Sequence, residues 1–430
     1  MWREDYVVDY AVFNDTLVMK ENGPEYASVF YYPIGNDVVG ALKEIETFAR
    51  SKNLPLSFGC LTDEQARFLT ERYYSVDCSF ERDWCDYIYS AEQFKTYAGK
   101  KLSGQRNHVN KFKKLYPNYS FKVATPNDLQ KIKEFFAGFK VSRAFSEEES
   151  NEICEAMDLT ENMFELGQVG GYIEVDGRVV AFSIGEVVGE TLIVHIEKAL
   201  TEYQGVYPLM AKEFACAFAT DNVKYINREE DCGDEGLRTS KTQYRPIELV
   251  NKNYLQVFTL FDKISAPVSL KTQRLTITDV KKDDKDIYRK LYLDDDLNKW
   301  WGYDYREDLG ENEPTVDYFF EFMNSLKKVK EEYSLAVRVG EQMIGELVLH
   351  NFDFYGGVEM GFRFFSDCQG KGYAIESASA LKDYVKTVLG AKRIKSRCFK
   401  ENVRSRKVIE RLGLKLERED ATHFYFGLDL

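Results

Sequence analysis

The stretch Gln369-Gly-Lys-Gly-Tyr-Ala374 decides the fold that this sequence predicts. It follows an apolar, aromatic run over 358–365 that is typical of a short buried strand. It precedes a segment over 375–389 whose apolar residues recur at helical spacing, with Gly390 in the position of a helix C-cap. The pattern therefore predicts a strand, a tight glycine turn and a helix. The glycines let backbone N–H groups approach a ligand closely, and the start of the helix adds partial positive charge, so this geometry suits a phosphate group.

The segments that follow distinguish this turn from an ordinary strand–helix connection, which also often contains glycine. A basic strand is expected over 391–399, and Asn402-Val-Arg-Ser405 opens another helix that ends near residue 413. In order and spacing, residues 270–430 resemble the GNAT N-acetyltransferases of the ribosomal-protein and polyamine type. In that family a Q-x-x-G-x-A loop binds the pyrophosphate of acyl-CoA. The resemblance implies an acetyltransferase fold with acetyl-CoA as its cofactor.

The resemblance also implies a general base on the strand before the glycine loop. Glu359, two residues before Gly361, is the first candidate to take a proton from the amine, with Glu346 and His350 as reserves. Burial of a carboxylate would raise its pKa toward the working range. The alternative is that Glu359 forms an ion pair with Arg363 on the same strand face.

The helix that begins after Asn402 is expected to supply further groups. By the resemblance, Asn402 orients acyl-CoA or a catalytic water, and Ser405 protonates the leaving thiolate, a task that the family more often gives to Tyr. Both residues also fit a helix N-cap and its third position. Arg406 fits either a CoA phosphate or solvent. The residues expected to bind the cofactor are Phe362, Phe364, Gln369, Gly370, Lys371, Gly372, Tyr373, Ala374, Asn402 and Arg404.

An aromatic loop over 298–305 lies between helices expected over 283–294 and 314–330. In the family this helical pair forms one wall of the acceptor pocket. Trp300, Trp301, Tyr303 and Tyr305 fit an acceptor slot and a contact between subunits equally well, so an oligomer remains possible.

The first half of the chain alternates strand and helix patterns, which indicates α/β layers. Asp176-Gly177 between apolar runs indicates a hairpin. Strands are expected over 7–13, 27–32, 56–61, 84–89, 119–124, 170–175, 179–188 and 191–197, and helices over 38–50, 64–73, 104–115 and 206–220.

Four short motifs in this half occur in a recognisable order, namely 104–112, 195–198, 227–231 and 236–241. They resemble a bacterial family related to the C-terminal domain of phosphatidylglycerol lysyltransferases, some members of which take an aminoacyl group from aminoacyl-tRNA. The resemblance covers most of 1–255 and implies two GNAT-like folds in tandem. It does not extend acetyl-CoA binding to this half, because the Gln-Gly-Lys-Gly loop is absent from it.

The motifs also imply residues for a substrate of the first half. His195 fits an acid or base and equally a satisfied core histidine, and residues 227–231 fit either a site or a salt-bridged loop. The substrate residues expected here are Arg106, Asn110, His195, Glu197, Asn227, Arg228, Arg238 and Lys241.

Residues 93–127 contain no acidic residue and interleave lysines with aromatic side chains. This pattern fits a site for charged tRNA or for a phospholipid head group. It also fits a solvated basic face on an acidic protein, with Lys111 and Lys114 on one side of a helix.

Composition narrows the class of protein. A length of 430 residues suggests about three domain-sized units, and no apolar run approaches the ~20 residues that cross a membrane. The start, residues 1–5, is not typical of a signal peptide. Scattered cysteines and only four histidines predict no metal site and favour a reducing cytoplasm. The net charge of −13 argues against general affinity for nucleic acid.

The sequence as a whole predicts an α/β protein with mixed sheets and three GNAT-like acyl-CoA N-acyltransferase folds, over 1–118, 119–265 and 266–430. The last fold is expected to transfer acetyl from acetyl-CoA to an amine within a ternary complex. The lysyltransferase-like module before it is expected either to transfer an aminoacyl group or to bind a lipid or another substrate. The amine of a small molecule or a peptide fits as acceptor, and the sequence does not choose between them.

Overall fold

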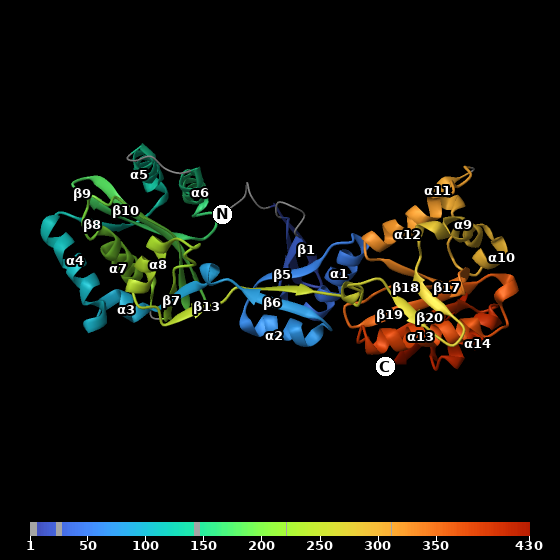
Figure 1. Ribbon diagram of the computed structural model, residues 1–430. Coiled ribbons are helices and arrows are strands. Elements are labelled where there is room, and N and C mark those ends of the chain that lie inside the picture. The colour runs from blue at the N-terminus through green and yellow to red at the C-terminus, as the bar shows by residue number, and fades with distance from the viewer. Residues whose placement is uncertain (1–6, 23–27, 142–146, 221, 311) are drawn as a thin grey trace. The chain divides into compact units, whose positions relative to one another are not determined.

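The computed structural model describes residues 7–22, 28–141, 147–220, 222–310 and 312–430 (Figure 1). The start of the chain, residues 1–5, lies outside the described residues. Backbone contacts divide the chain into two compact units. Unit 1 comprises Met1–Leu42, Phe58–Ala66 and Cys78–Tyr254, and unit 2 comprises Lys43–Ser57, Arg67–Asp77 and Leu255–Leu430. Two short segments of the first half therefore belong to the same unit as the C-terminal half.

The first sheet has seven strands in the order β1-β2-β3-β5-β14-β6, with β4 paired to β2. Its expected strands and the two helices near it begin and end within one residue of their predicted limits, whereas β2, β4, β6 and β14 were not predicted. The elements are β1 (Val7–Phe13), β2 (Thr16–Asn22), β3 (Ser28–Tyr31), β4 (Ile34–Gly35), α1 (Val38–Ser51), β5 (Leu56–Leu61), α2 (Asp63–Arg72), β6 (Val76–Phe80) and β14 (Asn253–Val257).

The second sheet lies in unit 1 and has the order β13-β7-β12-β11-β10-β9-β8. It mixes the antiparallel meander β9-β10-β11 with the parallel pair β11-β12. Its strands are β7 (Asp86–Ser90), β8 (Ser120–Val123), β9 (Val169–Val175), β10 (Arg178–Val188), β11 (Thr191–Ala199), β12 (Tyr225–Asn227) and β13 (Glu248–Val250).

Helices cover both faces of this second sheet (Figure 1). The ring of Phe136 on α5 meets Phe182 of β10 edge to face at 5.8 Å, and α7 lies along β9, β10 and β11. The helices are α3 (Ala91–Thr96), α4 (Ser103–Leu115), α5 (Leu129–Val141), α6 (Glu147–Asn162), α7 (Val206–Phe218) and α8 (Glu235–Gln243).

The third sheet lies in unit 2 and has eight strands in the order β15-β16-β17-β18-β19-β20-β22-β21. Only β19 and β20 are parallel neighbours, and the C-terminal hairpin β21-β22 was not predicted. The strands are β15 (Ser269–Lys271), β16 (Thr276–Asp279), β17 (Glu332–Val339), β18 (Gln342–His350), β19 (Gly357–Phe364), β20 (Arg393–Phe399), β21 (Lys415–Glu419) and β22 (His423–Asp429).

The central strands of the third sheet are buried on both faces because they carry apolar residues at successive positions, and neighbouring side chains of a strand point to opposite faces. Leu335 and Val337 face a core that includes Leu381 and Val385, while Ala336 joins a second cluster of residues. Figure 1 shows the two layers of helices that make these cores. One layer consists of α9 (Lys285–Leu293), α10 (Asp295–Asn298), α11 (Arg306–Leu309) and α12 (Tyr318–Lys328), and the other of α13 (Tyr373–Thr387) and α14 (Val403–Arg411).

Tyr74 ties a segment of the first half into unit 2. Its hydroxyl lies 2.7 Å from the carbonyl oxygen of Gly390 and 3.1 Å from that of Leu389, at the C-terminal end of α13. Its backbone N–H donates to the carbonyl of Phe354 at 2.9 Å. The end of the helix that follows the glycine loop is thus held by a residue that precedes it by more than 300 positions.

None of the described helices combines the length and the apolarity that crossing a membrane requires.

Candidate functional sites

Strands β19 and β20 separate along their length. Their parallel pairing covers only Gly357–Glu359 against Arg393–Lys395, although β19 continues to Phe364 and β20 to Phe399. Just beyond the paired stretch, the Ser396 hydroxyl donates to the carbonyl of Met360 at 2.9 Å. Backbone N–H and C=O groups that a continuous sheet would pair therefore face an opening between the two strands, where an extended ligand could hydrogen-bond to them.

The glycine loop lies between the end of β19 and the start of α13. Gly370 and Gly372 have φ angles of 75° and 83°, which L side chains rarely adopt, and Gly372 is the N-cap of α13. Arg274 fixes the loop, because it donates to the carbonyl of Lys371 at 3.0 Å and pairs with Glu376 at 2.7 Å. A Cβ on Gly372 would lie 3.3 Å from this guanidinium. The first N–H groups of α13 have no intrahelical acceptors, so the loop and helix form a cradle for an anion.

The start of α14 is joined to the same loop. Arg404 donates to the side-chain oxygen of Gln369 at 2.9 Å, and the amide of Gln369 donates to the carbonyl of Phe364 at 3.0 Å. Asn402 caps α14, since its side-chain oxygen accepts from the N–H of Ser405 at 3.1 Å. Arg406 instead pairs with Glu410 one helical turn away, at 2.8 Å. The loop, Arg404 and Asn402 thus lie around one end of the opening between β19 and β20.

Three titratable residues form a row across the third sheet. The register pairs Glu332 of β17 with His350 of β18, and His350 with Glu359 of β19, so the three side chains share one face. Glu359 accepts a hydrogen bond from Asn351 at 2.9 Å and lies 3.8 Å from Nε2 of His350. Arg397 is 3.4 Å from Glu359 on the other side. This row lies at the edge of the opening.

The environment sets the protonation of the row. Burial lowers the pKa of His350, against the opposing effect of the Glu359 charge, and this favours the neutral imidazole. Burial, with the neighbouring charge of Glu346, raises the pKa of Glu332 to about 7. A carboxyl that titrates there suits the exchange of protons with an amine. The sequence did not single out Glu332. The register of the Gly340-Glu341 turn alone would place it opposite Leu349, and the shift between Val337 and Arg338 brings it opposite His350.

The alternative pairing of Glu359 with Arg363 is wrong. Arg363 pairs instead with Glu346 across the strands at 2.5 Å and donates to Asn298 at 2.5 Å. Glu346 is fully buried, so this reserve candidate for the general base is enclosed in an ion pair. Because Arg363 pairs with Glu346, the neighbours of the Glu359 carboxylate are Asn351, His350 and Arg397.

The Arg363 guanidinium also holds the aromatic loop in place. It lies between the rings of Tyr292 and Trp301, at 3.9 and 4.5 Å from their centroids. Trp301 lies against β19 where that strand has no side chain, since a Cβ on Gly361 would be 3.4 Å from its ring. Trp301 therefore forms a wall beside the opening. Tyr303 stacks on Phe322 of α12, and Tyr305 meets Phe319 of the same helix edge to face.

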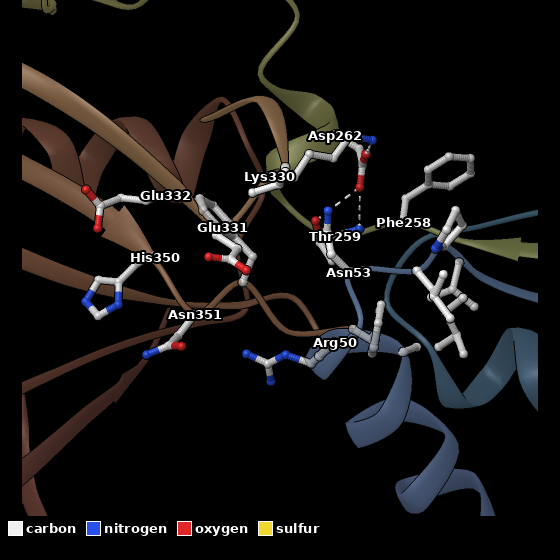
Figure 2. A pocket seen from close by; sticks show the side chains of 18 of the residues that line it. Arg50, Asn53, Phe258, Thr259, Asp262, Lys330, Glu331, Glu332, His350 and Asn351 are labelled. Carbon is white, nitrogen blue, oxygen red and sulfur yellow. Dashed lines mark hydrogen bonds and ion pairs between the residues drawn. The ribbon is translucent and has the colours of Figure 1, made fainter. Parts of the chain in front are cut away.

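A pocket of about 600 Å³ lies within unit 2 beside this row (Figure 2). Glu332 and His350 line it, as do residues at the C-terminal end of α1 and the start of β5. Residues 256–259 and the end of α12 complete the wall. The pocket therefore reaches the titratable row from the side opposite the glycine loop.

In unit 1, His195 lies between two carboxylates. Its Nδ1 is 2.8 Å from Glu229 and its Nε2 is 3.3 Å from Glu186. Burial opposes the charged imidazole, but the hydrogen bond and charge of Glu229, together with Glu186, outweigh it and raise the pKa of His195. Glu186 was not predicted, because its contact depends on the pairing of β10 with β11. The site can hold a proton at near-neutral pH.

Next to His195, a buried ion pair joins Arg228 to Glu197 at 2.9 Å. The Arg228 guanidinium lies 4.8 Å from the ring centroid of Tyr244. Lys241 donates to the carbonyls of Arg228 and Glu229 at 2.7 and 3.3 Å. Burial, followed by the charge of Arg228, lowers the pKa of Lys241 to about 8. The loop after β12 therefore packs over partly buried charged side chains, namely Glu197, Arg228 and Lys241.

The other expected substrate residues of unit 1 have structural contacts. Asn227 donates to Asp86 at 2.9 Å, and Arg238 pairs with the fully buried Asp231 at 2.8 Å. Arg106 donates to the carbonyl of Gly99 at 2.6 Å, and Asn110 is exposed on α4. The structure thus gathers His195, Glu197, Asn227, Arg228 and Lys241 around one loop, and places Arg106 and Asn110 on α4.

Carboxylates neutralise part of the positive charge of the basic stretch over residues 93–127. Lys113 pairs with Glu213 at 3.4 Å, and Lys122 pairs with Glu174 at 3.2 Å. Lys111 and Lys114 are exposed on α4, and within the described part of the chain no carboxylate pairs with either. In the same part of the chain, His, Cys, Asp and Glu side chains do not gather into a set that could hold a metal ion.

Two family models match the chain. Residues 1–255 match the C-terminal domain of phosphatidylglycerol lysyltransferase, and residues 274–415 match the GNAT acetyltransferase domain. The first match spans more than half of the chain. Both resemblances inferred from the motifs are therefore confirmed.

Individual proteins resemble parts of the chain. A crystal structure of a Bacteroides thetaiotaomicron protein of unknown function has a TM-score of 0.53 and is 30% identical, with 59% of this chain and 87% of that one covered. An uncharacterized N-acetyltransferase, p20 of Bacillus licheniformis, is 25% identical over 35% of this chain and 83% of its own length. YnaD of Bacillus subtilis, also an uncharacterized N-acetyltransferase, is 30% identical over 20% of this chain and 51% of its own length.

These matches agree with the architecture that was predicted. The mixed α/β sheets and the tandem GNAT-like arrangement are confirmed by the two family matches together with the sheet topology.

Proposed function

Because the chain belongs to the family of the phosphatidylglycerol lysyltransferase C-terminal domain through residues 1–255, and carries a GNAT N-acetyltransferase domain over residues 274–415, we propose that the latter transfers acetyl from acetyl-CoA to an amine. The observation that carries this proposal is the opening between β19 and β20 that ends on the glycine loop and the start of α13. An extended thioester chain fits between separated strands, and its pyrophosphate fits the anion cradle.

The cradle residues would bind the donor through complementary charge. Backbone N–H groups from Gly370 to Ala374 would hold the pyrophosphate, with Lys371 and Arg404 adding positive charge at its rim. The backbone of β19 around Phe362 and Phe364 would hydrogen-bond the extended arm of the cofactor. These contacts would place the thioester beside Gly361, under Trp301.

The reaction needs an amine without its extra proton. Glu359 would take that proton through a water molecule, and neutral His350 could pass it on to Glu332. The amine nitrogen would then attack the thioester carbonyl carbon, forming the C–N bond as the C–S bond breaks. Ser405 would give a proton to the leaving thiolate, and Asn402 would orient the thioester.

Calorimetric titration of the intact chain with acetyl-CoA tests the donor site. Gly372→Glu adds a side chain and a negative charge inside the cradle, so we expect binding to be lost. Gly340→Glu is the matched control, because Gly340 also has a positive φ, of 55°, and lies in the β17–β18 turn with open space around it. A wild-type chain that does not bind acetyl-CoA, or a Gly372→Glu variant that binds as tightly as wild type, would refute the donor site.

For the first half we propose a second activity, aminoacyl transfer from charged tRNA. The exposed pair Lys111 and Lys114 on α4 favours it, since neither lysine is neutralised by a carboxylate of the described residues. Reversing both charges to Glu should weaken tRNA binding more than reversing Lys113, which is already paired with Glu213. Unchanged tRNA binding would instead favour a module that binds a lipid or another acceptor.

A further inference from the structure

The pocket of unit 2 opens onto the reacting end of the acetyltransferase site. His350 lines the pocket, and its Nε2 lies 3.8 Å from Glu359, at the point where β19 and β20 begin to separate. Glu332, the neighbour of His350 across the sheet, lines the pocket too. A molecule in the pocket would therefore approach the thioester from the side opposite the CoA phosphates.

The pocket carries opposite charges on its two sides. Figure 2 shows Glu332, Glu331 and His350 along one side, and Arg50 extending from α1 toward them. Among the described residues, no carboxylate pairs with Arg50 and no cation pairs with Glu332.

Two of the remaining charges of the pocket, Lys330 and Asp262, compensate each other. Lys330 pairs with Asp262 at 2.5 Å, and the same carboxylate accepts from the backbone N–H of Thr259 at 2.8 Å. These groups therefore hold the wall of the pocket together. Glu331 joins Glu332 on the anionic side, and the exposed Lys328 at the end of α12 also lines the pocket. The cationic group that extends toward Glu332 and His350 is Arg50.

We propose that this pocket binds the amine acceptor and that the acceptor is a zwitterion, with its ammonium group against Glu332 and an anionic group against Arg50. The proposal rests on the acetyltransferase function proposed above. A simple amine would satisfy Glu332 and leave the guanidinium without a partner, whereas an amino acid matches both sides of the pocket. The neutral imidazole of His350 adds no charge to repel the ammonium group.

The same geometry makes the first half part of the acceptor site. Arg50 and Asn53 lie at the end of α1 and just after it, within the segment Lys43–Ser57 that belongs to unit 2. The GNAT strands supply the carboxylate side, and the lysyltransferase-like half supplies the cation. Acceptor choice is therefore divided between two parts of the chain that match different families.

The test uses the intact chain with acetyl-CoA and follows the release of the CoA thiol. The probes are ω-amino acids with one to seven methylene groups, each compared with its own amide, which keeps the amine and removes the negative charge. We expect at least one acid to have a KM about tenfold or more below that of its amide. Arg50→Gln should remove this preference while the affinity for acetyl-CoA, measured by calorimetry, is unchanged.

Two controls define the outcome. Lys43→Gln removes a charge from the exposed part of the same helix outside the pocket, and should leave the preference intact. Arg50→Lys should retain part of it. The proposal is overturned if the amides react as well as the acids, or if the preference for acids survives Arg50→Gln. It is also overturned if the chain binds acetyl-CoA but acetylates neither set of probes. Failure to bind acetyl-CoA at all is a different result, because it refutes the donor site on which the proposal rests.

Discussion

Replacing Glu332 by Gln should stabilise unit 2 at alkaline pH and leave its stability nearly unchanged in acid. Burial and the charge of Glu346 raise the pKa of Glu332 from 4.5 to about 7 in the folded chain. Below the unfolded pKa the carboxyl is protonated in both states and does not reduce the stability of the folded chain. Because the folded pKa is raised, stability is lost as the pH rises through the unfolded value toward the folded one, and the loss is complete above the folded value.

The size of the effect follows from the shift. Each pKa unit corresponds to about 1.4 kcal/mol, so a shift of roughly two and a half units costs the wild type about 3 kcal/mol once the carboxyl is ionised. A glutamine keeps the shape and can still hydrogen-bond Ser334, which lies 3.0 Å from the carboxylate. The stability gain of Glu332→Gln should therefore grow by about 3 kcal/mol between pH 4 and pH 8.

Urea unfolding followed by tryptophan fluorescence measures this difference. The chain has four tryptophans, and with Trp2 and Trp84 replaced by Phe the signal comes from Trp300 and Trp301 of unit 2. Glu331→Gln is the matched control, because it removes an exposed carboxylate next door and should show a much smaller dependence on pH. A gain that stays constant from pH 4 to pH 8, or a Glu332→Gln variant that is less stable at pH 8, would refute the reasoning.

Three further variants test contacts in the two units. Arg363→Met should destabilise unit 2 by about 3–5 kcal/mol in urea unfolding, because it leaves the buried charge of Glu346 without a partner, and Arg363→Met with Glu346→Leu should recover much of that loss. Asn402→Ala should cost about 1 kcal/mol as a lost N-cap and also weaken acetyl-CoA binding. Asp234 caps α8 in unit 1, so Asp234→Ala should lower stability without weakening acetyl-CoA binding. If the two capping variants change acetyl-CoA binding equally, a role for Asn402 in binding is contradicted. His195→Gln should destabilise unit 1 most at acid pH, because a raised histidine pKa gives stability that is present below the unfolded value and is lost as pH rises through the folded one. Unfolding at pH 5.5 and pH 9, followed through Trp84 alone, checks this.

Local patterns predicted most elements because helices, glycine turns and hairpins are encoded by residues close in sequence. The stretch from Gly357 to Ala374 shows this, since apolar alternation, two glycines and a helical period follow one another directly. The basic strand and the Asn402 cap were predictable for the same reason. The strand β14 was not, because its pairing partners β5 and β6 lie almost 200 residues earlier.

The site was less predictable than the fold because it depends on strand register and on distant segments. The sequence offered Glu359 as the partner of Arg363, and only the pairing of β18 with β19 shows that Arg363 faces Glu346. Glu332 became a candidate only through its position opposite His350. Arg50 carries no motif at all. Its place in the pocket follows from contacts of residues 43–57 with the C-terminal half, which no local pattern records.

The grip of Tyr74 on the end of α13 has a consequence for synthesis of the chain. The two partners are separated by 315 and 316 residues, so contacts of very long range close unit 2. At about 5–20 residues per second, a ribosome finishes Gly390 roughly 15–60 s after Tyr74. Throughout that interval the ring of Tyr74 and the end of α1 lack the C-terminal residues that contact them in the folded chain. Nascent chains are therefore most exposed to misassembly and to chaperones late in translation, and slowing elongation between the halves should lengthen that window.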